Sequence, residues 1–439
     1  LRNEAYKWSE NLKNNGSYRG KKIEQNDLNK LPILNVQFRV PNLTVGKKFE
    51  EKIIILDELN GKLEICGVKK DDEELSGLSV NHSTFIIDGV IQESGNFEIK
   101  LYCNLLLPTG EKQKVIGKVK VSVIPDPRSL WKNLPSDNTA RFHKSDKASD
   151  SFMTDSVNLI AASVRGRSHA HKGIHRDDDI KIYCPSSSGW NIICVADGAG
   201  SCKYSRRGAE LAVLRSTNTL RETLNGHYGI ELEKIINQSY SNDENDVQEA
   251  NSKYGEVLQN TIVKAVWDAA LAIQAEADHN EEDSFKDFST TLLLAAHKSI
   301  DGGHLIFCFW IGDGGAVIYE KGSGVQLLGE PDSGEYAGQT RFLDKKIFED
   351  GSIYGRIIAK KIDSMTALIL ATDGITDAKF ETEKQLSNLE CWDSLWSELE
   401  PIVTHEDLKQ GEKDLLEWMG FWSAGNHDDR SIAICYVKE

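Results

Sequence analysis

The chain has 439 residues, of which 39% are hydrophobic and 27% charged, and its formal net charge is −16. This length favours two domains, and the composition is that of a soluble globular protein. The negative charge argues against non-specific binding to nucleic acid or to an anionic membrane surface, and no apolar stretch approaches the ~20 residues that span a bilayer.

Residues 1–33 are polar and are predicted to form an N-terminal segment. They lack the apolar core of a signal peptide, and the eight cysteines of the chain include no Cys-x-x-Cys pair. Several cysteines lie within apolar runs, which is typical of buried, reduced thiols. We therefore expect a cytoplasmic protein.

Residues 34–124 contain short β-rich runs separated by turn residues, which predicts a β-sandwich module. The stretches "VPNLTVGKKFEEKIII" and "KVKVSVIPDP" resemble an immunoglobulin-like module, and the module carries no catalytic constellation. Residues 125–151 are rich in Pro, Asp, Ser and Lys and are predicted to be a linker.

Residues 152–439 mix strands and helices and are predicted to form the second domain. Strands are predicted over 156–166, 179–185, 190–197, 289–297, 304–312, 315–322, 365–374 and 431–438, and helices over 205–224, 256–278, 387–403 and 405–422. Ser205 is the predicted N-cap of the first helix, and the acidic stretch 239–255 is predicted to be a loop or a helix-capping insertion. The glycine-rich turn 312–315 predicts a hairpin and hence an antiparallel sheet, and the irregular order of strands and helices argues against a doubly wound parallel sheet.

Carboxylates follow or precede the apolar runs at five places: Asp197-Gly198, Asp313-Gly314, Asp373-Gly374, Asp428-Asp429 and Asp177-Asp178-Asp179. A single Asp-Gly is typical of a hairpin turn, but a helix follows the first one, and all five groups fall at strand ends. If those ends converge, the carboxylates repel one another and their pKa values rise unless a cation lies between them. Oxygen ligands without His or Cys suit Mg²⁺ or Mn²⁺ better than Zn²⁺.

The stretches "VADGAG", "STTLLLAA", "FWIGDGGAVIY", "LILATDGITD" and "HDDRSIAICYV", in this order, resemble the metal-dependent protein phosphatase 2C family, in particular its bacterial branch. The stretch "GEYAGQTRFL", residues 334–343, also resembles that branch, and the match covers about residues 155–439. The resemblance implies an α+β fold: an antiparallel β-sandwich flanked by helices on both faces, preceded here by the small all-β module. It also implies that phosphoserine and phosphothreonine in proteins are hydrolysed by a water activated between two Mg²⁺ or Mn²⁺ ions.

The resemblance also implies roles for individual residues. Asp197 would bridge two ions, with the Gly198 carbonyl on one of them, and Asp373 and Asp428 would complete the first ion's ligands. These three carboxylates would be the catalytic residues. Asp313 would form a weaker third site with Asp373, and Asp377 would hold metal-bound waters. Asp177 and Asp178 occupy the two places of the family's early acidic pair.

The expected phosphate-binding residue departs from the family pattern. Many members carry an Arg shortly before the acidic pair, and Gly173 occupies that place here. His169, which matches a His of the bacterial branch, and Arg176 are the two candidates, and we prefer His169. Arg176 has an alternative role, a surface ion pair with Asp177 or Asp179.

The expected partners are a phosphoprotein substrate and a cognate Ser/Thr kinase, with no nucleic acid or membrane, and the N-terminal module would target or regulate the enzyme. No Cys-x5-Arg loop or Gly-x-Ser-x-Gly elbow indicates a protein nucleophile. Two alternatives remain open: a phosphatase-like scaffold that binds a kinase or phosphoprotein without turnover, and a phosphohydrolase for small molecules.

Overall fold

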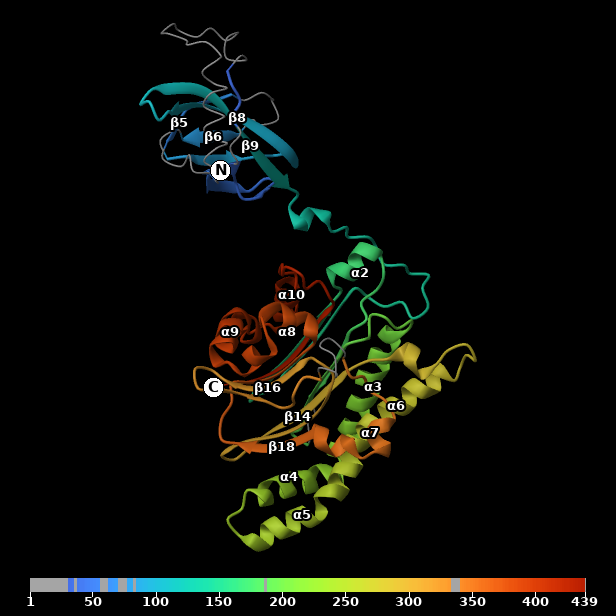
Figure 1. Ribbon diagram of the computed structural model, residues 1–439. Coiled ribbons are helices and arrows are strands. Elements are labelled where there is room, and N and C mark those ends of the chain that lie inside the picture. The colour runs from blue at the N-terminus through green and yellow to red at the C-terminus, as the bar shows by residue number, and fades with distance from the viewer. Residues whose placement is uncertain are drawn as a thin grey trace. The chain divides into compact units, whose positions relative to one another are not determined.

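The computed structural model describes residues 31–34, 38–55, 62–69, 77–81, 84–184, 188–332 and 340–438. The chain divides into two units, Leu1–Trp131 and Lys132–Glu439, which are described separately below (Figure 1). Nearly all of the predicted N-terminal segment and residues 334–339 of the "GEYAGQTRFL" stretch lie outside the described residues. None of the helices in the described ranges offers the long apolar stretch that a bilayer crossing would require.

Strands form two sheets in the first unit, one in the order β4-β1-β9-β8-β5 with β2 beside β9, and one in the order β3-β7-β6. Their bounds are β1 (Phe38–Arg39), β2 (Leu43–Thr44), β3 (Lys48–Lys52), β4 (Ile54–Ile55), β5 (Leu63–Lys69), β6 (Leu78–Asn81), β7 (Ile86–Val90), β8 (Gly95–Leu106) and β9 (Lys112–Ile124). Side chains of β8 and β9 alternate across the sheet, so that Ile99, Leu101, Val119 and Val121 enter the core. The likeness to an immunoglobulin module stays a prediction.

Two antiparallel sheets form the centre of the second unit, in the orders β10-β11-β20-β19-β16-β17 and β12-β13-β14-β15-β18. Their bounds are β10 (Lys147–Met153), β11 (Val157–Val164), β12 (Asp179–Tyr183), β13 (Asn191–Ala196), β14 (Leu292–Ile300), β15 (Gly303–Ile311), β16 (Gly315–Glu320), β17 (Gly324–Leu327), β18 (Ile357–Ile362), β19 (Ala367–Ala371) and β20 (Arg430–Val437). Apolar side chains of the two sheets, among them Leu159, Val195, Leu293 and Leu368, form one buried cluster. Because β11, β13, β14 and β19 are buried on both faces, they appear in the sequence as continuous apolar runs.

Helices cover the outer face of each sheet in the second unit (Figure 1). The helices α3 (Ser205–Leu224), α4 (His227–Ser239), α5 (Glu244–Leu258) and α6 (Lys264–Ala277), with a π turn at Gln259–Val263, pack on the sheet that contains β13. The helices α8 (Asp373–Lys379), α9 (Leu389–Val403) and α10 (Leu408–Trp418) pack on the other sheet. Short helices α2 (Arg167–Lys172) and α7 (Lys346–Glu349) complete the unit. This mixed arrangement of sheets and helices agrees with the prediction.

The glycine-rich turn at 312–315 does not form the predicted hairpin. The strands on either side of it, β15 and β16, belong to different sheets, and β16 pairs with β17 and β19. Gly312 adopts a φ of 122°, which side chains rarely allow, and the chain passes there from one sheet to the other. A turn motif predicts that the chain reverses, but it does not predict which strand will pair with the strand that follows the turn.

The acidic stretch 239–255 is mainly helical, because Asp243 caps α5 by accepting a hydrogen bond from Asn245 N, and residues 244–277 then continue as helix. Ser205 is the first residue of α3, and the capping position is Tyr204 instead.

The structure also differs from the predicted linker in residues 132–151. Leu134 N donates to Ala170 O at 2.9 Å, and β10 pairs along its whole length with β11. The hydroxyls of Ser149 and Ser151 donate to the Glu412 carboxylate. The polar residues that suggest a linker therefore form hydrogen bonds with the rest of the second unit.

Candidate metal centre

The three Asp-Gly pairs lie at the same end of the two sheets of the second unit. Asp197 follows β13, Asp313 follows β15, and Asp373 begins α8 directly after β19 and Thr372. Carboxylate oxygens of these three residues lie within 4.8 Å of one another, although β19 belongs to the other sheet. The convergence expected from the sequence is therefore present for this group.

Two threonines of the "STT" stretch hold the backbone of Asp197 in place. Asp197 N donates to Thr291 Oγ1 at 2.8 Å, and Asp197 O accepts from Thr291 N at 2.8 Å and from Thr290 Oγ1 at 2.9 Å. At the next residue, a Cβ on Gly198 would lie 2.7 Å from Asp177 O and 2.9 Å from Ser205 O. Only glycine fits there, because three segments of the chain meet at this point.

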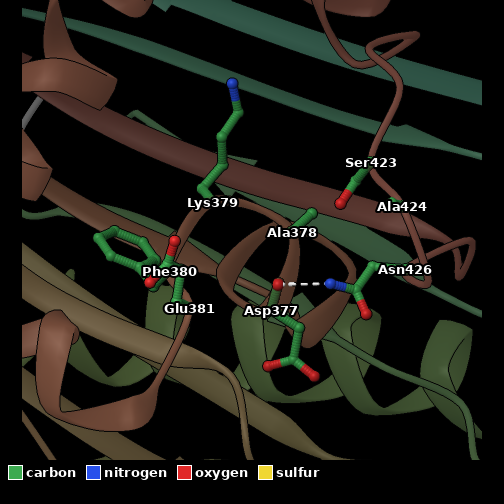
Figure 2. Close-up of a pocket in the computed structure, with 8 residues that line it drawn as sticks. All are labelled: Asp377, Ala378, Lys379, Phe380, Glu381, Ser423, Ala424 and Asn426. Atoms are coloured by element: carbon green, nitrogen blue, oxygen red, sulfur yellow. Dashed lines mark hydrogen bonds between the residues drawn. The ribbon is translucent and has the colours of Figure 1, made fainter. Parts of the chain in front are cut away.

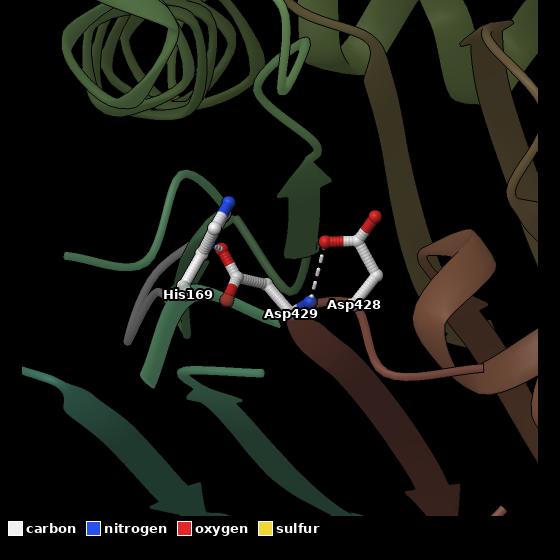
Figure 3. Close-up of side chains that lie close together, drawn as sticks. All are labelled: His169, Asp428 and Asp429. Carbon is white, nitrogen blue, oxygen red and sulfur yellow. Dashed lines mark hydrogen bonds and ion pairs between the residues drawn. The ribbon is translucent and has the colours of Figure 1, made fainter. Parts of the chain in front are cut away.

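A second group consists of His169, Asp428 and Asp429, which also offer ligand atoms within 4.8 Å of one another. Asp429 is 1% exposed and accepts three hydrogen bonds, from His169 Nδ1 at 2.8 Å, Gly166 N at 2.6 Å and Asp177 N at 2.5 Å. Figure 3 shows the Asp429 carboxylate directed toward His169, while Asp429 N lies beside an oxygen of Asp428. Asp428 is exposed and accepts only from Asp429 N, at 2.8 Å, among the described residues.

The His169–Asp429 pair carries opposite charges. Burial alone would raise the pKa of the Asp429 carboxyl, but the hydrogen bond and charge of His169 lower it. Burial of His169 disfavours its protonated form and by itself lowers the pKa of the imidazole. The hydrogen bond to Asp429 and the charge of Asp429 outweigh this effect and raise the pKa to about 9. Asp429 is thus a site residue to which the sequence analysis gave no role, and its only signal was the Asp428-Asp429 doublet.

Four other carboxyls of the site have pKa values that are shifted upward: Asp178, Asp197, Asp373 and Asp428. Burial and then the charge of Asp429 raise the pKa of Asp178 to about 7, although Thr372 Oγ1 donates to Asp178 at 2.8 Å. Burial, followed by the charges of the neighbouring carboxylates, raises the pKa values of Asp197 and Asp373 well above the ordinary range. The pKa of Asp428 is also raised, because neighbouring protein groups partly desolvate its carboxyl and because Asp429 carries a negative charge. The protein therefore holds several carboxyls together against their mutual repulsion.

These residues fit hard divalent cations. Within the described part of the chain, the buried oxygens Asp177 Oδ1 and Asp313 Oδ1 have no hydrogen-bond partner, while Thr340 Oγ1 donates to the other Asp313 oxygen. Unpaired carboxylate oxygens at the edge of a repelling cluster are suitable ligands for Mg²⁺ or Mn²⁺. The two groups of ligand atoms, and the raised pKa values of Asp197, Asp373 and Asp428, are consistent with this chemistry.

The candidate phosphate-binding residues differ in their surroundings. Arg176 is buried and donates to Ser145 O, Ser163 Oγ and the Asp179 carboxylate. Its guanidinium is thus occupied inside the protein, which favours the ion-pair alternative, although the pair is buried and not on the surface. His169 uses Nδ1 for Asp429, and its Nε2 lies 3.7 Å from Asp177 Oδ2; its role in binding phosphate stays a prediction.

Arg206 on α3 also reaches this region, with Nε 3.4 Å from Asp177 Oδ1, and the sequence analysis did not select it. The sequence offers no sign of this contact, because it joins residues 29 positions apart on different elements.

Asp377 lies on α8 beside a pocket of about 340 Å³ (Figure 2). Burial and the charges of Asp313 and Glu383 raise the pKa of the Asp377 carboxyl. Asn426 Nδ2 donates to Asp377 O at 2.5 Å and so ties α8 to the loop before β20. The pocket is lined by Asp377, Ala378, Lys379, Phe380, Glu381, Ser423, Ala424 and Asn426.

The family model described as Protein phosphatase 2C matches residues 165–420. A curated relative, Serine/threonine-protein phosphatase 3 of Escherichia coli (strain K12), is 30% identical over 192 residues, which are 42% of this chain and 62% of the relative. The chain thus matches less than two thirds of that relative's length.

Two solved structures are also similar. One is a bacterial serine phosphatase, which is 12% identical, with a TM-score of 0.37 and coverage of 64% of this chain and 97% of that chain. The other is the catalytic domain of the serine threonine protein phosphatase PstP in complex with two manganese ions, with 13% identity, a TM-score of 0.37 and coverage of 65% and 99%.

Proposed function

Because the chain belongs to the protein phosphatase 2C family, we propose that it hydrolyses phosphoserine and phosphothreonine in proteins with the help of Mg²⁺ or Mn²⁺. One observation carries this proposal. Asp197, Asp313 and Asp373 converge at one end of the two sheets, and the pKa values of Asp197 and Asp373 are raised well above normal. A carboxylate cluster of this kind is costly to a protein that does not use it to bind cations.

We assign the metal ligands accordingly. Asp197 would bridge two ions, with the Gly198 carbonyl on one of them, and Asp373 and Asp428 would complete the ligands of the first ion. Asp313, with Asp373, would serve a third, weaker site. Asp177, Asp178 and Asp377 would hold ions or their waters at the edges of the cluster. When bound, such ions lower the pKa of a bridging water and neutralise charge on the phosphoryl oxygens.

The chain's own residues fix the positions of these ligands. The two threonines before β14 set the direction of Asp197 through its backbone. The three hydrogen bonds on Asp429 hold the start of β20, and this leaves the neighbouring Asp428 carboxylate exposed and free to ligate. We infer that Asp429 is a positioning residue for Asp428 and that His169 holds Asp429 through Nδ1, while its predicted contact with phosphate would use Nε2.

Phosphate release tests the proposal. We expect the full chain to release phosphate from a phosphothreonine peptide and from p-nitrophenyl phosphate in MnCl₂, and to stop when EDTA is in excess. Asp197→Asn and Asp373→Asn should lose nearly all of this activity while circular dichroism shows a folded protein, because each removes a proposed ligand.

Other outcomes distinguish the alternatives. Turnover undiminished in EDTA, or full turnover by Asp197→Asn, would contradict the metal mechanism. Binding of the phosphopeptide without phosphate release would support the scaffold, and release from p-nitrophenyl phosphate but from no phosphopeptide would support a small-molecule phosphohydrolase.

The β-sheet unit before Trp131 contains none of the proposed ligands. We propose that this unit, as an immunoglobulin-like module, targets or regulates the enzyme, and that a Ser/Thr kinase acting on the same phosphoprotein is a partner. Removal of the first unit should therefore change activity on protein substrates and leave the hydrolysis of p-nitrophenyl phosphate unaltered.

A further inference from the structure

A phosphoryl dianion that approaches this acidic cluster needs positive charge from the protein as well as from metal ions. Besides His169, whose Nε2 lies 3.7 Å from Asp177 Oδ2, three basic side chains surround the Asp177-Asp178-Asp179 stretch: Lys144, Arg176 and Arg206. Their hydrogen bonds determine which of them is available to a substrate.

Lys144 and Arg176 are both fully engaged. Lys144 Nζ donates to Asp178 O at 2.7 Å, Asp179 Oδ2 at 3.2 Å and Arg206 O at 3.3 Å, which uses all three of its protons. Arg176 donates from all three guanidinium nitrogens to acceptors inside the protein, including both contacts to Asp179 Oδ1 at 3.3 Å. Neither cation is free to face a ligand.

Arg206 is in a different situation. It lies in the first turn of α3, its side chain is 14% exposed, and its Nε is 3.4 Å from Asp177 Oδ1. Among the described residues this ion pair is its one side-chain contact with a charged group, and the terminal nitrogens of the guanidinium donate no hydrogen bond there. The ion pair with Asp177 therefore holds the guanidinium at the edge of the carboxylate cluster and leaves its two terminal nitrogens available.

Asp177 connects Arg206 to the rest of the site. Its Oδ2 lies 3.7 Å from His169 Nε2, and its backbone N donates to Asp429 at 2.5 Å. A Cβ on Gly198, the residue after Asp197, would lie 2.7 Å from Asp177 O, so the Asp177 backbone also passes close to the Asp-Gly turn. Asp177 thus connects Arg206 with His169 through its carboxylate, with Asp429 through its backbone N, and with the Asp197-Gly198 turn through its backbone O.

We propose that Arg206 binds the phosphoryl group of the substrate, with its two terminal nitrogens donating to two phosphoryl oxygens. This inference rests on the proposed phosphatase function. A planar guanidinium with unused donors matches two oxygens of a phosphate, which an ammonium group does not. Arg206 then supplies from α3 the cation that Gly173 cannot supply from the segment before Asp177.

Calorimetry with inorganic phosphate tests this inference on the full, Mn²⁺-loaded chain. We expect Arg206→Ala to weaken phosphate binding, and to raise KM for p-nitrophenyl phosphate, by roughly tenfold to a hundredfold, the usual effect of losing a charge-assisted hydrogen bond. Arg206→Lys should restore little of the phosphate affinity, because an ammonium group cannot donate from two parallel nitrogens as a guanidinium does. Mn²⁺ affinity, titrated without phosphate, should change less than twofold.

Arg215→Ala is the matched control, because it removes the same charge from an exposed position on the same helix and should behave as wild type. Equal phosphate binding by wild type and Arg206→Ala would overturn the inference. A loss of Mn²⁺ affinity as large as the loss of phosphate affinity would also overturn it, since Arg206 would then only position Asp177. If wild type binds phosphate but never turns over a substrate, the phosphatase proposal fails while a loss of binding in Arg206→Ala still supports the inference.

Discussion

The Asp178 carboxyl should make the metal-free protein less stable as pH rises. Its pKa is raised from the ordinary value near 3.8 to about 7 by burial and by Asp429. Between these two pKa values, Asp178 keeps its proton in the folded state but loses it in the unfolded state. The folded state therefore becomes less stable as the pH rises from about 4 to about 7. In EDTA, the unfolding free energy should therefore fall between pH 4 and pH 7, and Asp178→Asn should remove part of the fall.

Urea unfolding in EDTA at pH 5 and pH 7.5 measures this effect. At pH 7.5 we expect Asp178→Asn to exceed wild type by roughly 1–3 kcal/mol, since one unit of pKa shift corresponds to about 1.4 kcal/mol. At pH 5 the difference in unfolding free energy between Asp178→Asn and wild type should be smaller. In saturating Mn²⁺ wild type should be the more stable of the two, because ligand binding stabilises the folded state that binds it better. Asp301→Asn, at an exposed carboxylate, is the control. Equal stability of Asp178→Asn and wild type at pH 7.5 would contradict the repulsion argument.

The sequence reveals the proposed metal ligands better than it reveals the residues that hold those ligands in place. Asp197, Asp313 and Asp373 stand out because each interrupts an apolar run beside a glycine, and the structure brings all three together. The buried partner Asp429 and the contact of Arg206 with Asp177 depend on which elements meet in space. Residue spacing along the chain carries no information on such contacts.

At the scale of an element, Gly198 should be needed for the packing of β13 and α3 against the segment before β12. Alanine at this position would place its Cβ 2.7 Å from Asp177 O and 2.9 Å from Ser205 O, and one of these segments would have to move. We expect Gly198→Ala to lower the unfolding free energy by about 1–3 kcal/mol, as overpacking does, and to weaken Mn²⁺ binding.

Gly200→Ala is the matched control two residues later, since a Cβ there meets nothing within 4 Å. Thermal unfolding and Mn²⁺ titration of the two variants compare them directly. If Gly198→Ala and Gly200→Ala are equally stable and bind Mn²⁺ equally well, then the close approach at Gly198 is not required.

Strands and helices with a strong pattern are predictable, and their partners are not. The predicted helix 205–224 matches α3, and the predicted strand 190–197 contains β13. The Asp-Gly turn at 312–315 predicts a hairpin, because it signals a chain reversal without indicating that β15 and β16 belong to different sheets. The hydrophilic residues of β10 predict a linker, because their pairing with β11 and with the distant Glu412 leaves no pattern in the sequence.

For the whole molecule, the division of the chain before Lys132 has a consequence for the metal centre. Residues 132–151 contain Lys144, whose ammonium lies between Asp178 and Asp179, and Ser145, whose carbonyl accepts from Arg176. They also contain most of β10, which covers the edge of β11. This segment therefore supports the acidic stretch before β12 although it contributes no proposed ligand.

We expect a fragment of residues 132–439 to fold and to hydrolyse p-nitrophenyl phosphate with Mn²⁺ as the full chain does, because it keeps all proposed ligands and their supports. A fragment of residues 152–439 should be poorly soluble or inactive, since it exposes the β11 edge and leaves Asp179 without Lys144. Solubility, thermal unfolding and phosphate release by the two fragments and the full chain measure this difference. Equal stability and turnover by both fragments would show that residues 132–151 are dispensable, and an inactive 132–439 fragment would show that the metal centre depends on the first unit.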